Sequence, residues 1–388
     1  MISTRCGDAM PSVARRLGST FTTVLIAAAS VAMASSRAGA QLSDPVAGAG
    51  VMLESYSFSD KEQVDIDKVS LLTVPLSVRV ALAHRVELGV TSAYASGTLT
   101  RRDGQSTTLS GLTDTEIRLT YQMANDRVRL SAAAMAPTGK SKLTAGEMDV
   151  MGVVAADLLP FAISNWGSGG GLGINASVVQ PVSEETSVGV SAGYVVARKY
   201  EPLSATTFAY RPGNQLHVRA GADHRVGSAA KASLQLTYLH FGLDQNAGAN
   251  FYQSGDRLQA VGSLAFAAGT GTGIVYAGYL QRRGGKFTEV VRVTPAQDLA
   301  YAGTGFRQRV GGLVLAPTLD VRLLGSDVGV EQGRTISAGL NAEVPAGNFD
   351  VVPLVRARVG HLTIRTAQES GFTGFEVGLS IRNRTFAR

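Results

Sequence analysis

The sequence predicts an all-β fold, a transmembrane antiparallel up-and-down β-barrel of about 14 to 16 strands with short periplasmic turns and longer extracellular loops. One short helix is expected in a long loop. Three observations support this prediction. Short segments alternate apolar and polar side chains along most of the chain, the connections between them alternate in length, and the polar face carries many charges. A packed soluble core could not hold that many charges without partners.

The clearest unit is a hairpin from Gly171 to Arg198. Leu172 and Ile174 fall on one face of its first strand, and Gly173 and Ser177 fall on the other. After a turn, the same alternation resumes along the second strand. A soluble sandwich would also alternate, so the number of repeats decides between the two folds.

The alternation recurs from about Val51 to the end of the chain. The apolar sets of the best-defined other strands are Leu72 to Val80, Val86 to Val90, Ile117 to Met123, Leu216 to Ala222, Leu234 to Tyr238, Leu258 to Phe266, Leu313 to Val321, Ile336 to Val344 and Phe375 to Ile381. The pattern is weakest over Val51 to Phe58, Gly273 to Arg282 and Ala300 to Arg309.

The connections alternate between short and long. Short turns are expected near His84, Asn125, Glu184, Gly227, Gly269, Gly311 and Ala346. Longer connections are expected near Lys61, near Gly104, and over Lys140 to Gly167, Pro202 to Gly213, Gln245 to Gly255, Gly284 to Asp298, Gly325 to Gly333 and Thr363 to Gly371. This asymmetry is typical of an outer-membrane barrel, and a sandwich has no reason to show it.

Met1 to Ala40 is predicted to be an export signal cleaved after Ala40, which leaves a barrel domain from Gln41 to Arg388. Arg15 and Arg16 precede an apolar run too short to span a bilayer comfortably. The only cysteine, Cys6, lies in this segment, so the mature chain would have no disulfide and no thiolate site.

The charge and hydropathy of the chain favour an outer-membrane location. The formal charge of +6 falls to +3 when the signal removes four arginines and one aspartate, which is too mild for a nucleic-acid binder. Mean hydropathy is +0.11, yet no apolar run is long enough for a membrane-spanning helix. In lipid, only a closed barrel would then satisfy every backbone group.

The long connection from Lys140 to Gly167 is predicted to contain the short helix. Thr144 to Glu147 fits a capping box. Residues at helical spacing follow it: Met148, Met151, Ala155 and Leu158. Folded inward, this loop would narrow the lumen, and the candidate constriction residues are Lys140, Lys142, Glu147, Asp149 and Asp157. Folded outward, it would cover the rim or contact a neighbouring subunit, and the sequence leaves both arrangements open.

The polar face carries the candidate lumen and solute-binding residues. They are Arg79, Arg118, Arg129, Arg219, Asp223, Asp320, Arg322, Glu343, Arg356, Arg358 and Glu376. Five further charged residues share this face: Glu87, Glu116, Arg307, Arg309 and Arg382. Because arginine outnumbers carboxylate there, the lumen is expected to favour small anionic or amphipathic solutes that enter by passive diffusion. The alternative is that Arg–Glu pairs merely hold a closed barrel together, and that the outer loops serve a structural or adhesive role.

Several motifs fail in context. Gly269 to Gly273 resembles a nucleotide-binding loop but joins two strands. The five histidines lack metal-ligand spacing, and we expect no metal, no cofactor and no catalysis. A minor alternative is an outer-membrane hydrolase that acts on lipid through His240, near the outer rim.

Two motifs carry a resemblance to a known family. The segment Ser110 to Thr115, with Tyr121 ending the strand after it, precedes a Pro-Thr-Gly-Lys motif over Pro137 to Lys140. In these motifs the chain resembles the outer-membrane barrels grouped as the phenol-degradation meta-pathway family. The resemblance spans about Gly111 to Leu243 and implies a channel that admits small, often aromatic, compounds.

The expected partners follow from a location in the bacterial outer membrane. They are the lipid bilayer, lipopolysaccharide, a small-molecule solute and, during insertion, the barrel-assembly machinery. No nucleic-acid partner is expected, and a homo-oligomer remains open, as do the identity of the solute and the exact number of strands.

Overall fold

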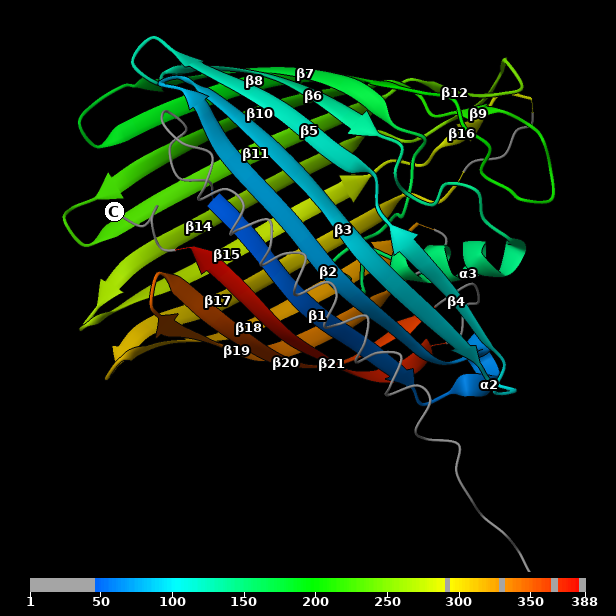
Figure 1. Cartoon of the computed structure of the whole chain (residues 1–388). Helices are drawn as coiled ribbons and strands as arrows, with labels where there is room; N and C mark the ends of the chain where they lie inside the picture. The colour runs from blue at the N-terminus through cyan, green and yellow to red at the C-terminus, as the bar shows by residue number, and fades with distance from the viewer. Residues whose placement is uncertain (1–45, 290–293, 328–331, 364–368, 384–388) are drawn as a thin grey trace, which may run out of the picture.

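The computed structural model describes residues 46–289, 294–327, 332–363 and 369–383. The predicted signal segment therefore lies outside the described residues. The dominant feature is one large sheet in which every neighbouring strand is antiparallel (Figure 1). Its strands around the barrel, in chain order, are β1 (Val46–Phe58), β2 (Ile66–Ala83), β3 (Val86–Arg101), β5 (Thr115–Met123), β6 (Val128–Ala136), β7 (Gly171–Pro181), β8 (Thr186–Ala197), β10 (Gln215–Val226), β11 (Ala230–Phe241), β14 (Arg257–Ala268), β15 (Gly271–Arg282), β17 (Gln297–Val310), β18 (Leu313–Ser326), β19 (Gly333–Ala346), β20 (Phe349–Thr363) and β21 (Glu369–Asn383).

The sheet closes on itself, because β1 pairs with both β2 and the last strand, β21. The sheet contains 17 strands, but β4 (Ser106–Leu112) and β5 pair one after the other along the same edge of β3. Sixteen strands therefore surround the barrel, at the upper end of the predicted range. A closed barrel leaves no unpaired edge.

The predicted alternation of connections is confirmed. Seven connections are tight and gather at one end of the barrel, which we call the turn end. Several of these turns place a glycine at positive φ, for example Gly227 and Gly311 at +60° and +62°. The longer connections gather at the opposite end, the loop end. There, a second small sheet is built from β9 (Tyr210–Arg211), β12 (Leu243–Asn246), β13 (Ala249–Gln253) and β16 (Lys286–Phe287).

The two faces of the wall differ as the alternation predicts. On β7 and β8, Ile174, Leu172 and Val190 are 68%, 64% and 61% exposed, and they share the outward face. Such exposure of large apolar side chains along a strand is the pattern of a wall that faces lipid. The opposite face of these two strands carries mostly small residues, such as Gly173 and Ser191.

The two helices, α2 (Lys61–Val64) and α3 (Ala145–Val154), lie in loop-end connections. The predicted capping box of α3 is confirmed, since the Thr144 hydroxyl accepts from the Glu147 N–H and the Glu147 carboxylate accepts from the Thr144 N–H. Within the described residues, no helix is long and apolar enough to cross a membrane.

The predicted apolar spacing of this helix needs a correction. The buried residues of α3 are Val150, Val153 and Val154, whereas Ala155 is exposed. The methionines at the predicted positions pack only partly against the core. The helix ends at Val154, so Leu158 belongs to the segment that follows it.

Candidate solute pathway in the barrel lumen

The connection between β6 and β7, residues 137–170, folds into the barrel. Gly97 on β3 lies on the same strand face as Leu99, which is 2% exposed. A Cβ atom on Gly97 would lie 3.0 Å from the Trp166 ring and 3.1 Å from Val150 Cγ1. Because the opposite face of β3 belongs to the outer wall, α3 and Trp166 pack on the inner wall. We call residues 137–170 the inner loop.

An apolar core joins the inner loop to the wall inside the barrel. Trp166 is 0% exposed, and its indole N–H donates to the Ala95 carbonyl over 3.1 Å. The core is formed by buried residues of the wall and of the inner loop: Tyr56, Phe58, Val64, Ile66, Val69, Leu71, Ala95, Leu99, Leu109, Leu143, Val150, Val153, Val154, Leu158, Leu159, Trp166, Leu362 and Phe372. On the side of β1 to β4, the loop end of the lumen is therefore filled with side chains.

Asp114, between β4 and β5, ties both ends of the inner loop to the wall. One of its carboxylate oxygens accepts from the Gly139 N–H over 3.0 Å. The other accepts from the Ser168 N–H and hydroxyl over 2.7 and 2.8 Å. The two sequence motifs that carry the family resemblance thus meet at this residue. The sequence prediction did not identify Asp114 as an anchor.

Beyond α3, the inner loop crosses the lumen. Asp157 pairs with Arg282 on β15, with 2.7 Å between Oδ2 and Nη2. In the ring of sixteen strands, β3 is third and β15 is eleventh, so these walls lie opposite each other. The Ala162 N–H then returns to the wall of β1, where it donates to Glu54 over 2.8 Å.

Each candidate constriction residue takes part in an ion pair. Asp149 bonds to Arg101 on β3, and Lys142 bonds to Glu201 in the next long connection. Lys140 and Glu147 bond to each other over 2.5 Å inside the inner loop. Together with the pair of Asp157, these contacts fix the position of the loop.

Three lumen candidates form a buried network beside the inner loop. Arg358 and Glu376 are 2% and 4% exposed and form an ion pair. Arg358 also donates to the Tyr56 hydroxyl over 2.6 Å and lies 3.6 Å from Glu54. Arg356 bonds to the same Glu376 oxygen over 3.0 Å. This cluster balances two arginines against two carboxylates, and all but Arg356 are buried, so it joins β1, β20 and β21 rather than offering free charge.

Further candidates form pairs that remain open to the lumen. Glu343 accepts from Arg307 over 2.6 Å and from Arg382 over 2.8 Å. Arg322 lies 3.8 Å from Asp320, whose carboxylate also accepts from Ser337.

Two similar pairs lie on other parts of the wall. Asp223 bonds to Lys231 over 2.9 Å, and Arg118 bonds to Glu116 over 2.8 Å. Of these pairs, Arg307–Glu343, Arg382–Glu343 and Lys231–Asp223 join different strands, whereas Arg322–Asp320 and Arg118–Glu116 lie within one strand.

Arg79, Arg129 and Arg219 are different, because in the described part of the chain none of them pairs with a carboxylate. Pairing registers place Arg129 opposite Ser177, Ser177 opposite Ser191, and Ser191 opposite Arg219. The four side chains thus lie in one row on the inner face of β6, β7, β8 and β10. Three strand spacings separate the two arginines, or about 14 Å. We call Arg129, Ser177, Ser191 and Arg219 the arginine row.

The wall around the arginine row is lined by small residues. Gly173, Gly189 and Gly193 share the inner face of β7 and β8 with the two serines. These small side chains take up little space beside the arginine row, on a part of the wall away from the α3 core.

The described histidines form no metal-binding cluster, and the Thr186 hydroxyl lies 2.9 Å from His224 Nδ1. No group of three or more His, Cys, Asp or Glu residues within residues 46–289, 294–327, 332–363 and 369–383 could hold a metal ion. His240 Nδ1 lies 2.9 Å from Asp256, and no serine hydroxyl bonds to this ring among the described residues.

Comparisons with known proteins give only distant similarities. No model of a known family and no curated protein matches the chain. Among solved structures, the chain is similar to a triple mutant of the Rhodopseudomonas blastica porin, with 14% identity and a TM-score of 0.40 over 88% of this chain and 100% of that chain. It is also similar to a loop L8 deletion mutant of OmpT, an outer membrane protein of Vibrio cholerae, with 8% identity and a TM-score of 0.41 over 88% and 98% of the two chains.

Proposed function

We propose that this barrel is a passive channel of the bacterial outer membrane for small anionic or amphipathic solutes. The observation that carries the proposal is the arginine row, in which two unpaired arginines and two serines face the lumen. Guanidinium and hydroxyl groups are the donors that a carboxylate or phosphate needs. A solute would diffuse past them without any covalent step.

The location follows from the outer wall. Apolar side chains are exposed around the barrel, including Leu53 on β1, Leu236 on β11 and Val359 on β20 at 40%, 45% and 52%. Exposing such a belt to water would be costly, whereas lipid accommodates it. With the short connections in the periplasm, the small sheet and the entrance to the inner loop would face outward. Lipopolysaccharide and the barrel-assembly machinery are partners in this setting.

The distribution of paired and unpaired charges favours anions. The groups around Glu376, Glu343, Asp320 and Asp223 contain about as many cations as carboxylates, so their long-range fields largely cancel. The arginine row then gives the part of the lumen lined by β6, β7, β8 and β10 a net positive charge. A positively lined pore favours anions.

The inner loop is proposed to set the size limit of the passage. It fills one side of the lumen and touches the opposite wall through Asp157 and Arg282. The resemblance to the phenol-degradation meta-pathway family adds a solute class to test first, namely small aromatic acids. These carry an anion for the arginine row and an apolar ring.

A structural or adhesive barrel is the second candidate. The observation in its favour is the small sheet at the loop end, where Tyr252 packs on Phe287 at 4.9 Å between ring centroids. An ordered cap of this kind could bind a partner outside the cell. This alternative predicts no solute flux.

The experiment is a measurement of reversal potential across a planar bilayer under a salt gradient. Replacing Arg129 and Arg219 together with glutamine should lower the permeability ratio of anion to cation. Arg102→Gln is the matched control, because Arg102 is exposed in the turn after β3 and lies outside the lumen. If the double variant and the control give the wild-type ratio, the arginine row does not select the solute.

A further inference from the structure

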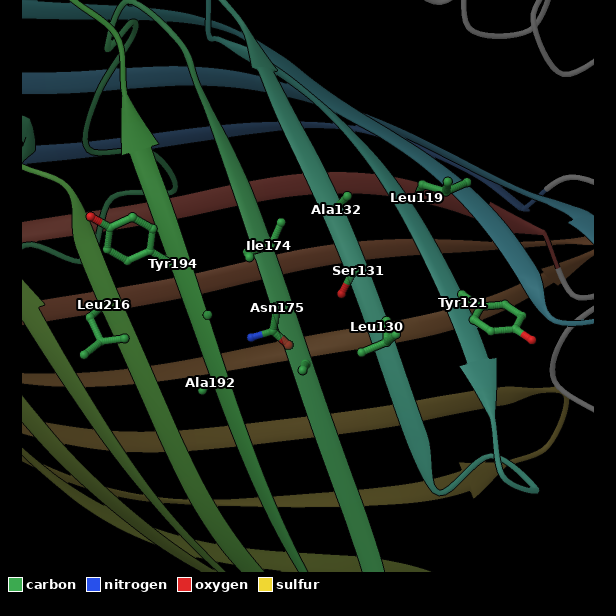
Figure 2. A pocket seen from close by; sticks show the side chains of 12 residues that line it. Leu119, Tyr121, Leu130, Ser131, Ala132, Ile174, Asn175, Ala192, Tyr194 and Leu216 are labelled. Atoms are coloured by element: carbon green, nitrogen blue, oxygen red, sulfur yellow. The ribbon is translucent and has the colours of Figure 1, made fainter.

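The outer wall carries a groove with a polar end. Figure 2 shows side chains that line it, which come from β5, β6, β7, β8 and β10. Its volume is about 550 Å³. The outward side chains that line it are Ala132, Ala176 and Ala192, together with the larger Leu119, Tyr121, Leu130, Ile174, Tyr194 and Leu216. The alanines therefore make a depression in an otherwise bulky apolar surface.

A second, polar pocket continues this groove toward the loop end. It has a volume of about 260 Å³, and it shares Tyr194 and Leu216 with the groove. Arg211, Asn214 and His240 also line it. Since β8 ends at Ala197 and β10 begins at Gln215, this pocket lies at the rim, above the apolar groove.

Arg211 is the cation of this pocket. Its Nε donates to the Ala197 carbonyl over 3.2 Å, and in the described residues its guanidinium is not paired with any carboxylate. The nearby carboxylates have other partners: Asp256 accepts from His240 and Tyr238, and Asp244 accepts from Tyr210 and the Gly213 N–H. The guanidinium is therefore oriented by the protein but not neutralised by a direct partner.

Tyr194 joins the two parts. Its ring borders the groove, and its hydroxyl accepts from Asn214 Nδ2 over 3.0 Å. An aromatic ring with a bonded hydroxyl at the end of an apolar surface is characteristic of the boundary between hydrocarbon and headgroups. The apolar groove thus lies at hydrocarbon depth and the Arg211 pocket at headgroup depth.

We propose that this combined site binds a phosphorylated, multiply acylated lipid of the outer leaflet. An acyl chain would lie over the three alanines, and a phosphate would accept from the Arg211 guanidinium, whose planar set of N–H donors can bond to two phosphate oxygens at once. The inference rests on the proposed outer-membrane location, but it concerns the outer wall and not the lumen. Charge complementarity at the rim and the apolar groove beneath it support one occupant with both characters.

The test is native mass spectrometry of the purified, refolded barrel released from detergent with added lipid. The probes are a diphosphorylated lipid A, a zwitterionic phosphatidylethanolamine and inorganic phosphate. We expect lipid A adducts on the wild type. Arg211→Gln removes the cation of the polar pocket and Ala176→Trp fills the apolar groove, so each variant should lower the apparent affinity for lipid A about tenfold. Ala338→Trp on the outward face of β19 and Arg102→Gln are the matched controls and should bind as the wild type does.

The proposal is overturned if the two site variants retain lipid A as the controls do, or if phosphatidylethanolamine binds equally well. Binding of inorganic phosphate at Arg211 without any lipid would also overturn it, since the site would then serve a free ion. Heat-modifiable migration on a gel checks folding, and Ala192→Phe replaces Ala176→Trp if the latter fails to fold. Conductance is measured in bilayers without lipid A, so failure of the channel proposal is seen separately.

Discussion

The pair between Asp157 and Arg282 is predicted to hold the far side of the inner loop against the opposite wall. Both side chains are partly buried, at 23% and 28% exposure, and 2.7 Å separates their nearest atoms. Asp157→Asn keeps the shape but removes the charge. Loss of a charged hydrogen bond in such a setting costs about 1 to 2 kcal/mol. The population of a displaced segment should then rise about 5- to 30-fold.

This displacement should stay local. The apolar core around Trp166 and the contacts of Asp114 remain in the variant, so α3 should stay on the inner wall. Two measurements report the change. Amide exchange of residues 156–165 should accelerate, and single-channel recordings should show more frequent current fluctuations at nearly unchanged mean conductance.

Lys142→Gln is the matched control, because it breaks the ion pair with Glu201, in which both side chains are about half exposed. Exposed pairs of this kind contribute little, about 0 to 1 kcal/mol. If amide exchange and current fluctuations increase no more in Asp157→Asn than in Lys142→Gln, the ion pair between Asp157 and Arg282 does not hold the loop. A double-mutant cycle with Arg282→Gln would show coupling in the first case and additivity in the second.

Three further predictions concern the anchors of the inner loop. Gly97→Leu should displace the Trp166 ring, because a Cβ atom alone would lie 3.0 Å from it. The displacement should shift the fluorescence emission of this single tryptophan to the red. An unchanged emission spectrum would show that the ring packs elsewhere. Asp114→Ala removes the acceptor of three bonds and should speed proteolysis at both ends of the loop, whereas cleavage at the wild-type rate would contradict its role. Burial raises the pKa of Glu147, but bonds from Lys140 and from the Thr144 N–H more than offset this and hold the pKa below its ordinary value of 4.5. The ionised Glu147 carboxylate therefore stabilises α3 fully above pH 4.5, and this stabilisation is lost as the pH falls through the lowered pKa. Amide hydrogen exchange of α3 should increase only below pH 4.5. A transition near neutral pH would be inconsistent with this role of Glu147.

Much of the barrel could be predicted from local sequence. The period of two decides which residues face outward, and the registers place every nominated lumen arginine on the inner face, as for Arg219 opposite Ser191. Turn positions such as Gly269 and Gly311 carry their own signal through glycine.

The weakest part of the pattern has a structural cause. Alternation is poor over Val51 to Phe58 because Tyr56 and Phe58 face inward, against Phe161 and Phe372. Where the inner loop covers β1, the inner face carries these aromatic side chains and the outer face carries Ser55 and Ser57, so the usual polarity of the two faces is inverted. The sequence showed the irregularity but not its origin.

Contacts between distant segments could not be predicted. The pair of Asp157 with Arg282 joins residues far apart in the chain, and nothing near either residue indicates the other. The division of the arginines into paired and unpaired sets also depends on which strands become neighbours. Two features of the sequence could have pointed to the residues that anchor the inner loop. They are Trp166, the single tryptophan, and the motif Pro137 to Lys140.

The most direct test of the central claim is the single-channel conductance of the wild-type protein together with its reversal potential under a salt gradient. An arginine-lined open pore should give discrete steps and a reversal potential that shows higher permeability for chloride than for potassium. Addition of a small aromatic acid such as benzoate should reduce the chloride current. A folded barrel that passes no current, or one that prefers potassium, would contradict the proposed anion channel.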